Sequence, residues 1–445
     1  MKFERHAVRS AVIDALGCRE LVWAGIRGDD VEPLSDLPQL QASFSIINAY
    51  DRRASVQGIA YEELTKRRVD LEVWDIDEQL DAPATRTFRQ GLLKALSGPS
   101  ALLPYRPSRF LSAIVFARRR SCVNLGLFGA LQSAFEHKPW VETSVADLGI
   151  PVVPWVYLAD EEQRDAERLL AAGPVLLRRS RTSGGEGILK VESIEELQKL
   201  WPHLPEAFMC VAPFLKGALP INVGATVWGP EAVSVHRPSL QLIGIPELVG
   251  RPFGYCGNDF TAVLDLERAH VETIEERVKT IGRWLARHGY LGTFGVDFLL
   301  HDGELLFTEI NARFQGSTHL SSQLSIEADE PCLMLEHIAA SLRLEPTEPP
   351  PLYQRMRERV DKSHVVVHWT GTSACAGLAA PVLDRLREVP GYARAEVVAG
   401  PDIAVEPGAA VLRATFARSV TTDGYSVAPV IAESVAKVWK ENPTC

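Results

Sequence analysis

The chain has 445 residues, of which 46% are apolar and 23% charged, so it is long enough for several packed domains and is not disordered in composition. Its 57 acidic side chains outnumber the 47 basic ones, which gives a formal charge of −10. Because nucleic acids and anionic membranes attract an excess of positive charge, this balance argues against both as general partners.

The first 120 residues alternate short apolar runs with more polar helical stretches. We expect strands at 20–25, 43–48, 70–74 and 113–116, and a helix at 85–96. This alternation predicts an open α/β domain. The dinucleotide fingerprint GxGxxG does not occur in it.

The pattern changes near residue 123. The expected elements are a helical run at 125–135, a strand at 174–177, a glycine-rich loop at 183–187, a helix at 194–201, strands at 208–215 and 222–228, a helix at 271–288, and strands at 292–300 and 304–311. A proline-rich segment at 345–351 is typical of a linker. Strands at 365–369, 395–399 and 409–416 and a helix at 432–440 then predict a small α+β domain.

The segment from Asp297 to Arg313 is the most informative. In a strand, Glu309 and Asn311 point to the same face. With Asp297 they offer the oxygen ligands that Mg²⁺ prefers, and Arg313 could hold an anion beside the ion. The alternative is an ordinary solvated strand edge with polar alternation.

The metal interpretation depends on the register of this hairpin. A two-residue loop of Asp302 and Gly303 would place Asp297 opposite Thr308, facing away from Glu309. A three-residue loop that also includes His301 shifts the pairing by one and places Asp297 on the face of Phe307, Glu309 and Asn311. We therefore predict the three-residue loop.

The strand at 174–177 is followed by basic side chains and by small residues. The backbone amides of such a loop can wrap around a phosphate group. A Gly-Gly-x-Gly loop is by itself most often a plain surface turn, so it gains weight only from the segments around it.

These segments occur in a distinctive order. Lys138 stands before Gly149, and is followed by the Arg178 strand, the glycine-rich loop, the 208–215 strand, the helix that ends at Gly289, and the Asp297 hairpin. Over roughly residues 123–340 this order resembles the ATP-grasp ligases. The arrangement with a further domain on each side is similar to the peptide ligases of natural-product pathways, of the pheganomycin type.

The resemblance implies a fold of mixed α/β and α+β domains. It implies a Rossmann-like pre-ATP-grasp domain at 1–122, an ATP-grasp core of two α+β lobes at 123–345, a linker at 346–360 and a C-terminal α+β domain at 361–445.

The resemblance also implies nucleotide contacts. Lys138 matches a nucleotide-binding lysine of the family, and Arg178 stands where a second lysine is usual. Ser183, Gly184, Gly185 and Gly187 match the loop around the terminal phosphates. The usual acid before the adenine-binding aromatic is replaced here by Ala212-Pro213, so the backbone of Phe214 and Leu215 is expected to meet adenine.

For the reacting groups, Asp297, Glu309 and Asn311 match the family's metal ligands, and Arg313 matches the arginine at the transferred group. Gln315, Gly316, Ser317 and His319 match a loop that faces the second substrate. His236 and Arg237 are further substrate-binding candidates, with a surface pair on a sheet edge as the equal alternative.

The function that this implies is an ATP-dependent carboxylate–amine ligase that uses Mg²⁺ or Mn²⁺ and acts on amino acids or peptides, as in antibiotic biosynthesis. An ATP-dependent carboxylase that activates bicarbonate, or a non-catalytic nucleotide-binding protein, are the alternatives. The partners would be a small carboxylate and an amine or peptide, and the oligomeric state, a homodimer included, is left open.

The seven scattered cysteines form no CxxC pair, and the first residues lack the apolar core of a signal peptide. We therefore expect reduced thiols, no zinc site and a cytoplasmic location.

Overall fold

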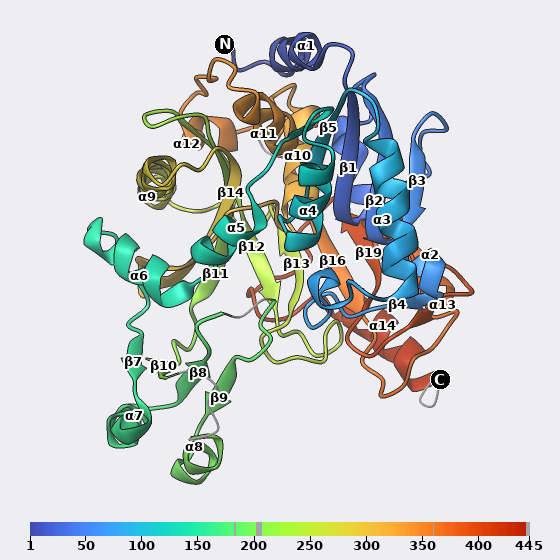
Figure 1. Cartoon of the computed structure of the whole chain (residues 1–445). Coiled ribbons are helices and arrows are strands. Elements are labelled where there is room, and N and C mark those ends of the chain that lie inside the picture. The colour runs from blue at the N-terminus through green and yellow to red at the C-terminus, as the bar shows by residue number, and fades with distance from the viewer. Residues whose placement is uncertain (182–183, 202–206, 359, 442–445) are drawn as a thin grey trace.

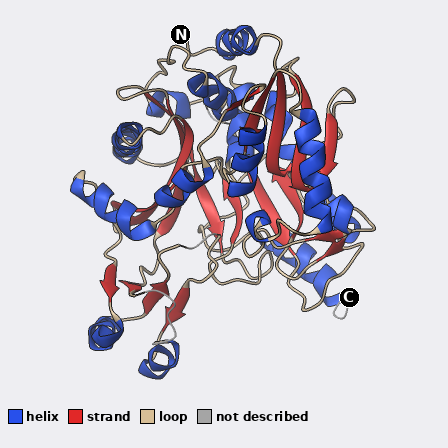
Figure 2. Cartoon of the chain, in the orientation of Figure 1, coloured by secondary structure: helices blue, strands red, loops and turns tan. Residues whose placement is uncertain are grey.

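The computed structural model describes residues 1–181, 184–201, 207–358 and 360–441. Three β-sheets and one two-stranded ribbon, with helices around them, form this part of the chain (Figure 1). Helices pack beside each of the three sheets, as the colouring by secondary structure in Figure 2 makes plain.

The N-terminal sheet is parallel and has the order β3-β2-β1-β5-β6. Its strands are β1 Glu20–Arg27, β2 Leu40–Ile47, β3 Gln57–Ala60, β5 Ser100–Pro104 and β6 Cys122–Asn124. Along β1, Leu21 and Trp23 enter one hydrophobic core, and Val22 and Ala24 enter another. The sheet is thus buried on both faces, as is usual for parallel strands.

Helices and short turns connect these strands. They are α1 Arg5–Leu16, the 3₁₀ turn η1 Gly28–Leu34, α2 Tyr61–Thr65, η2 Ile76–Glu78, α3 Pro83–Ala95 and α4 Arg109–Ala117. The expected strand at 113–116 is wrong, because Ser108 caps this segment as helix α4 by accepting a hydrogen bond from the Leu111 amide at 3.1 Å. Residues 70–74 form a turn and not the expected strand.

A small antiparallel sheet follows, with the order β7-β10-β8-β9. Its strands are β7 Val156–Leu158, β8 Val175–Arg178, β9 Leu189–Val191 and β10 Met209–Pro213, and its helical segments are η3 Asp160–Glu162, α7 Gln163–Ala172 and α8 Ile194–Leu200. This lobe extends at the lower left of Figure 1 and has a hydrophobic core of its own.

The largest sheet has eight antiparallel strands in the order β15-β14-β11-β12-β13-β16-β19-β17. The strands are β11 Leu219–Val227, β12 Val233–Ile243, β13 Tyr255–Asp259, β14 Gly292–His301, β15 Glu304–Asn311, β16 Ser363–His368, β17 Tyr392–Glu396 and β19 Ala410–Phe416. The C-terminal strands therefore continue the central sheet through the β13–β16 pair. A parallel ribbon of β4 Arg67–Arg68 and β18 Ala404–Val405 joins the first and last parts of the chain.

The remaining helices are α5 Gly129–Phe135, α6 Lys138–Asp147, α9 Arg268–Arg287, α10 Thr318–Glu327, α11 Leu333–Ser341, α12 Leu352–Met356, α13 Ala379–Arg387 and α14 Pro429–Glu441. The longest, α9, buries Ile274, Val278 and Ile281 at the predicted helical spacing. Gly289 lies just beyond it with a φ of +82°, a conformation that favours glycine.

The linker expected at 346–360 includes helix α12, whose Leu352 and Met356 are buried in the central core, so this segment is more than an exposed connection. Cys375 is disulfide-bonded, which corrects the expectation that all thiols are reduced. Among the helices of the described residues, none has the length and hydropathy that crossing a membrane requires. The division of the chain into four segments stays a prediction.

Candidate active site

The β14–β15 hairpin has the two-residue loop that the sequence analysis rejected. Asp302 and Gly303 both have positive φ, at +49° and +78°, and His301 pairs directly with Glu304. The pairing shifts by one residue beside Thr308: Phe298 faces Phe307, whereas Asp297 faces Glu309. A β-bulge, and not a longer loop, thus supplies the extra residue.

The bulge places the acidic side chains on one face. The Asn311 Nδ2 lies 3.3 Å from the Asp297 Oδ2 and 3.2 Å from the Glu309 Oε1. The Thr308 hydroxyl donates to the Asp297 carbonyl at 2.9 Å, which fixes the bulge. The predicted loop length was wrong, as was Phe307 on this face, but Asp297, Glu309 and Asn311 do converge.

Amide side chains from neighbouring strands surround Asp297. Asn222 of β11 and Gln241 of β12 donate to its Oδ1 at 2.5 and 3.2 Å. Asn222 also accepts from the Ser317 hydroxyl at 2.6 Å, which ties the loop after the hairpin to the same network. Burial raises the pKa of Asp297 more than the hydrogen bond from Asn222 and the charge of Lys138 lower it.

Lys138 is the first residue of α6 and reaches the same face. Its ammonium forms an ion pair with Glu309. Burial and the nearby charge of Arg178 lower the pKa of Lys138 to about 7, against the opposing effect of Glu142. The Lys138 backbone amide donates to the Ser180 carbonyl at 3.0 Å, so it is also connected to the segment that follows β8.

Arg178, the last residue of β8, is held on two sides. Its guanidinium lies 3.8 Å from the centre of the Trp155 ring and pairs with Glu142. Tyr157 donates to the other oxygen of that carboxylate at 2.7 Å. These contacts hold the Arg178 guanidinium in one orientation, so its position is set before any anion binds.

The hairpin residues, Lys138 and Arg178 line one cavity of about 450 Å³ between the small sheet, the large sheet and the N-terminal sheet. The predicted site residues in its wall are Lys138, Arg178, Gly184, Gly185, Phe214, Leu215, Asp297, Glu309, Asn311, Arg313, Gln315, Gly316 and Ser317. Most of the predicted site residues therefore lie together in the wall of one cavity.

Comparisons with known proteins agree with this arrangement. The model of an ATP-grasp domain matches residues 145–317. A search of the curated proteins found no match.

Solved structures with similar folds cover almost the whole chain. The biotin carboxylase domain of 2-oxoglutarate carboxylase from Hydrogenobacter thermophilus has a TM-score of 0.61 at 14% identity, over 90% of this chain and 86% of its own. N5-carboxyaminoimidazole ribonucleotide synthetase from Thermus thermophilus has a TM-score of 0.56 at 17% identity, over 94% and 98%. N5-carboxyaminoimidazole synthase from Aspergillus clavatus has a TM-score of 0.59 at 14% identity, over 95% and 99%.

The chain has the ATP-grasp fold. The predicted class of mixed α/β and α+β domains is thereby confirmed, while the narrower likeness to peptide ligases stays a prediction.

Several predicted residues lie away from the ATP-grasp cavity. His236 is buried and within 2.9 Å of Glu336, and Arg237 is buried and within 2.7 Å of Glu330. Neither belongs to the wall of the cavity, because both side chains serve these internal pairs. Gly187 is also outside that wall, and Ser183 lies outside the described residues.

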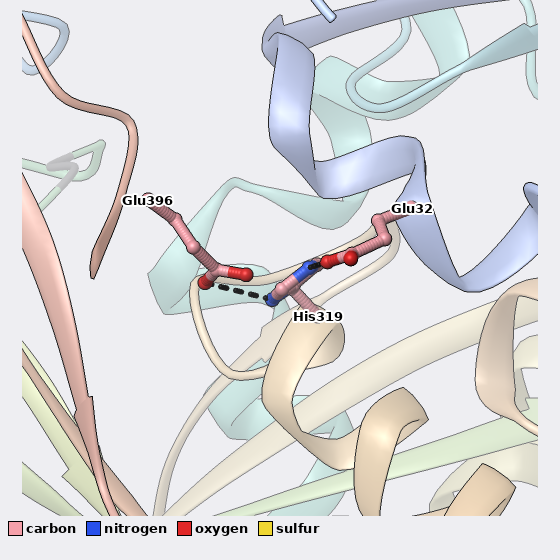
Figure 3. A group of neighbouring side chains, drawn as sticks. All are labelled: Glu32, His319 and Glu396. Atoms are coloured by element: carbon pink, nitrogen blue, oxygen red, sulfur yellow. Dashed lines mark ion pairs between the residues drawn. The ribbon is translucent and has the colours of Figure 1, made fainter. Parts of the chain in front are cut away.

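His319 lies in a different polar group. Figure 3 shows its imidazole between the carboxylates of Glu32 and Glu396, which come from η1 and β17, and each ion pair measures 3.5 Å. We call these three residues the His319 group. The side chain therefore connects distant parts of the chain and does not line the cavity, although Ser317, two residues earlier, does.

The sequence analysis missed other residues of the cavity wall. Arg27 at the end of β1, Tyr105 after β5 and Tyr255 of β13 line the end near the N-terminal sheet. Arg106 and Arg313 both contact Glu136, at 3.1 and 3.3 Å. Burial works to raise the pKa of Glu136, but the two arginines outweigh it and lower the pKa to about 2. No local motif marks these positions.

The donor set at the hairpin fits a hard divalent cation. Asp297 and Glu309 supply carboxylate oxygens, and Asn311 supplies an amide whose oxygen would have to replace its nitrogen toward the ion. Among the described residues, Asp297 has no ion-pair partner. A bound cation would therefore balance the negative charge of this buried carboxylate. Asp297, Glu309 and Asn311 are therefore the residues that would hold Mg²⁺.

Proposed function

We propose that the protein is an ATP-dependent ligase that joins a carboxylate to an amine. The observation that carries the proposal is the convergence of Asp297, Glu309 and Asn311 on one cavity with Arg313 and Lys138. An ATP-grasp fold with an oxygen donor set and two cationic side chains at the same point suits phosphoryl transfer from ATP.

The proposed nucleotide end lies between the two lobes. Lys138 and Arg178 would meet the phosphates, together with the amides of Gly184 and Gly185, whose φ values are +50° and +78°. A side chain on Gly185 would collide with the Phe253 carbonyl, so the loop requires glycine to approach the cavity this closely. Phe214 and Leu215, at the end of β10, would lie along the adenine.

The reaction divides into two steps. A substrate carboxylate oxygen attacks the γ-phosphate of ATP, which forms an acyl phosphate and releases ADP. The amine nitrogen then attacks the acyl carbon, the bond from that carbon to the phosphate oxygen breaks, and the proton of the amine leaves with phosphate. Mg²⁺ bound at the hairpin would neutralise charge on the phosphates.

Residues of this chain orient the reacting groups. Arg313 would hold the transferred group, and the ion pair with Glu136 fixes the Arg313 side chain. The loop of Gln315, Gly316 and Ser317 would face the substrate, since it lines the cavity directly beside Asn222. The proposal also includes substrates of amino acid or peptide type in a natural-product pathway and a cytoplasmic location. It keeps the division of the chain into the four segments named above.

A carboxylase that activates bicarbonate is the second candidate. It is favoured by the names of the similar structures, which include a 2-oxoglutarate carboxylase domain crystallised with MgADP and bicarbonate. At identities of 14 to 17% these similarities establish the fold. The same cavity would accept either bicarbonate or a substrate carboxylate.

Incubation of the full chain with ATP, Mg²⁺ and a panel of amino acids tests the proposal. ADP and phosphate should form only when a carboxylate and an amine are both present, with an amide of the matching mass. AMP and pyrophosphate would contradict the acyl-phosphate route. ADP formation that depends on bicarbonate and an acceptor, with a carboxylated product, would establish the second candidate instead.

A further inference from the structure

A second cavity, of about 530 Å³, lies at the edge of the N-terminal sheet, and we call it the N-terminal cavity. Its wall includes Gly25 and Ile26 at the end of β1 and Ile46 at the end of β2. The chain continues from β1 to β2 on one side and reaches β5 on the other, so the order of strands reverses beside β1. Open α/β sheets bind ligands at the carboxyl ends of strands at such a point.

The N-terminal cavity is connected to the proposed reaction centre. Arg106 lines both cavities, and it also lines a smaller cavity of about 280 Å³ between them. This intermediate cavity includes Glu136, which it shares with the N-terminal cavity, and Glu309 and Arg313, which it shares with the ATP-grasp cavity. A molecule in the N-terminal cavity would thus point toward Arg313.

Aromatic side chains form much of the wall. Phe44, Trp74, Phe88 and Phe110 all line the N-terminal cavity. Phe88 packs edge-on against Phe44 and parallel to Phe110, so three of these rings form a continuous apolar surface. A ligand would therefore bind more tightly if the part that lies against this surface were aromatic or aliphatic.

Among the described residues of this wall, one buried side-chain polar atom has no hydrogen-bond partner. The side-chain oxygen of Gln132 is buried and accepts no hydrogen bond, while the nitrogen of the same amide lies 3.3 Å from Glu136. By contrast, Asp77 in the same wall already accepts from the amides of Arg109 and Phe110, at 2.9 and 2.8 Å. The Gln132 side-chain oxygen is therefore a free hydrogen-bond acceptor in the wall. A buried acceptor without a partner favours a ligand that donates a hydrogen bond to it.

We propose that the N-terminal cavity binds the amine substrate, a primary amine that carries an aromatic or bulky apolar group. This inference rests on the proposed function. The apolar group would lie against the rings, the nitrogen would donate to Gln132, and the path past Arg106 would lead the nitrogen to the acyl carbon held near Arg313.

A substitution in the wall tests this placement. Ala130 of α5 is exposed and lines the N-terminal cavity, so Ala130→Trp should fill the cavity from its rim without changing a buried contact. Ala134 lies one turn later on the same helix, is also exposed and lines neither cavity, so Ala134→Trp is the matched control. Gln132→Leu removes the free acceptor.

Binding is measured by calorimetry with the full chain, using phenethylamine and ethylamine as probes in the presence of Mg²⁺ and a non-hydrolysable ATP analogue. We expect phenethylamine to bind at least about tenfold more tightly than ethylamine. Ala130→Trp should weaken phenethylamine binding at least about tenfold, Gln132→Leu by about five- to tenfold, and Ala134→Trp by less than about twofold. Equal affinity for the two amines, or unchanged affinity in Ala130→Trp, would overturn the inference.

The nucleotide titration separates this inference from the proposed function. The two tryptophan variants should bind the ATP analogue as the unchanged chain does, because neither Ala130 nor Ala134 lines the ATP-grasp cavity. Failure of the unchanged chain to bind the analogue would contradict the proposed function, whereas normal nucleotide binding with no preference for phenethylamine would overturn the inference alone.

Discussion

Two groups of acidic side chains in this molecule differ in how their charge is balanced. In the hairpin group, Glu309 forms an ion pair with Lys138, while Asp297 accepts hydrogen bonds from amide side chains. In the His319 group, Arg394 contacts Glu32 and Glu396 at 3.1 and 2.8 Å.

The His319 group has further cations. Arg413 lies 3.0 Å from Glu396 and 2.7 Å from Asp30, and Arg52 lies 2.8 Å from Glu32. Burial acts to raise the pKa of Glu32 and Glu396, but the charges around them lower both. In the hairpin group, burial prevails and the pKa of Asp297 is raised.

The difference shows that neighbouring carboxylates alone do not make a metal site. Glu32, His319 and Glu396 are close enough to hold an ion, yet arginines already neutralise them and Arg413 lies 3.0 Å from the imidazole Nδ1. The hairpin group faces a cavity and is short of positive charge. A divalent cation should therefore prefer the hairpin group.

The largest effect is expected when a cation is removed from the His319 group. Arg413→Met would leave Glu396 and Asp30 buried with less compensation, at a cost of about 3–5 kcal/mol in the free energy of unfolding. Urea unfolding at neutral pH measures this. A loss below about 1 kcal/mol would show that the group does not depend on its arginines.

Removing charge from the hairpin group should affect turnover more than stability. Glu309→Gln keeps the size of the side chain, so the fold should survive, while ATP turnover should fall by about 10²- to 10³-fold. ADP release in a coupled assay measures the rate, and circular dichroism checks the fold. Turnover within about threefold of the unchanged chain would refute the assigned role.

The two groups should also respond oppositely to acid. The lowered pKa values of Glu32 and Glu396 give stability that is fully present above their unfolded pKa of 4.5 and is lost as pH falls, by about 1 kcal/mol per carboxylate at about pH 4. The raised pKa of Asp297 has the reverse sign, since its ionised form costs stability above the unfolded pKa of 3.8.

Unfolding curves between about pH 7 and pH 4 test the signs. Glu396→Gln should flatten the loss of stability toward acid, whereas Asp297→Asn should make the protein no less stable at neutral pH. A steeper acid dependence in Glu396→Gln would contradict the comparison.

The smallest effect concerns Arg178. Arg178→Lys keeps the charge but loses the stacking on Trp155 and the planar contact with Glu142, so nucleotide binding should weaken by about three- to tenfold. Titration of a fluorescent ATP analogue measures this. An unchanged affinity would show that the position needs only a positive charge.

Sequence reasoning found the hairpin group because its members lie within fifteen residues and one strand pair aligns them. Even there, the register depends on a bulge beside Thr308, which no turn residue signals. The helix α9 was predictable from the spacing of Ile274, Val278 and Ile281, whereas β13 was hidden because Tyr255–Asp259 is rich in turn-forming residues.

The other parts of the site depend on contacts between distant segments. Glu32, His319 and Glu396 lie far apart in the sequence and meet only when η1, α10 and β17 pack together. His236 suggested a substrate contact because a histidine on a strand can face a cleft, but Glu336 from α11 covers it. Arg106 similarly has no motif and becomes visible only where three cavities meet.

The binding of Mn²⁺ in the presence of ADP, followed by electron paramagnetic resonance, tests the central claim most directly. The hairpin group should hold the ion, so Glu309→Gln should weaken Mn²⁺ binding at least about tenfold, while Glu32→Gln, a matched change in the His319 group, should leave it within about twofold. Weakened binding in Glu32→Gln with normal binding in Glu309→Gln would contradict the account.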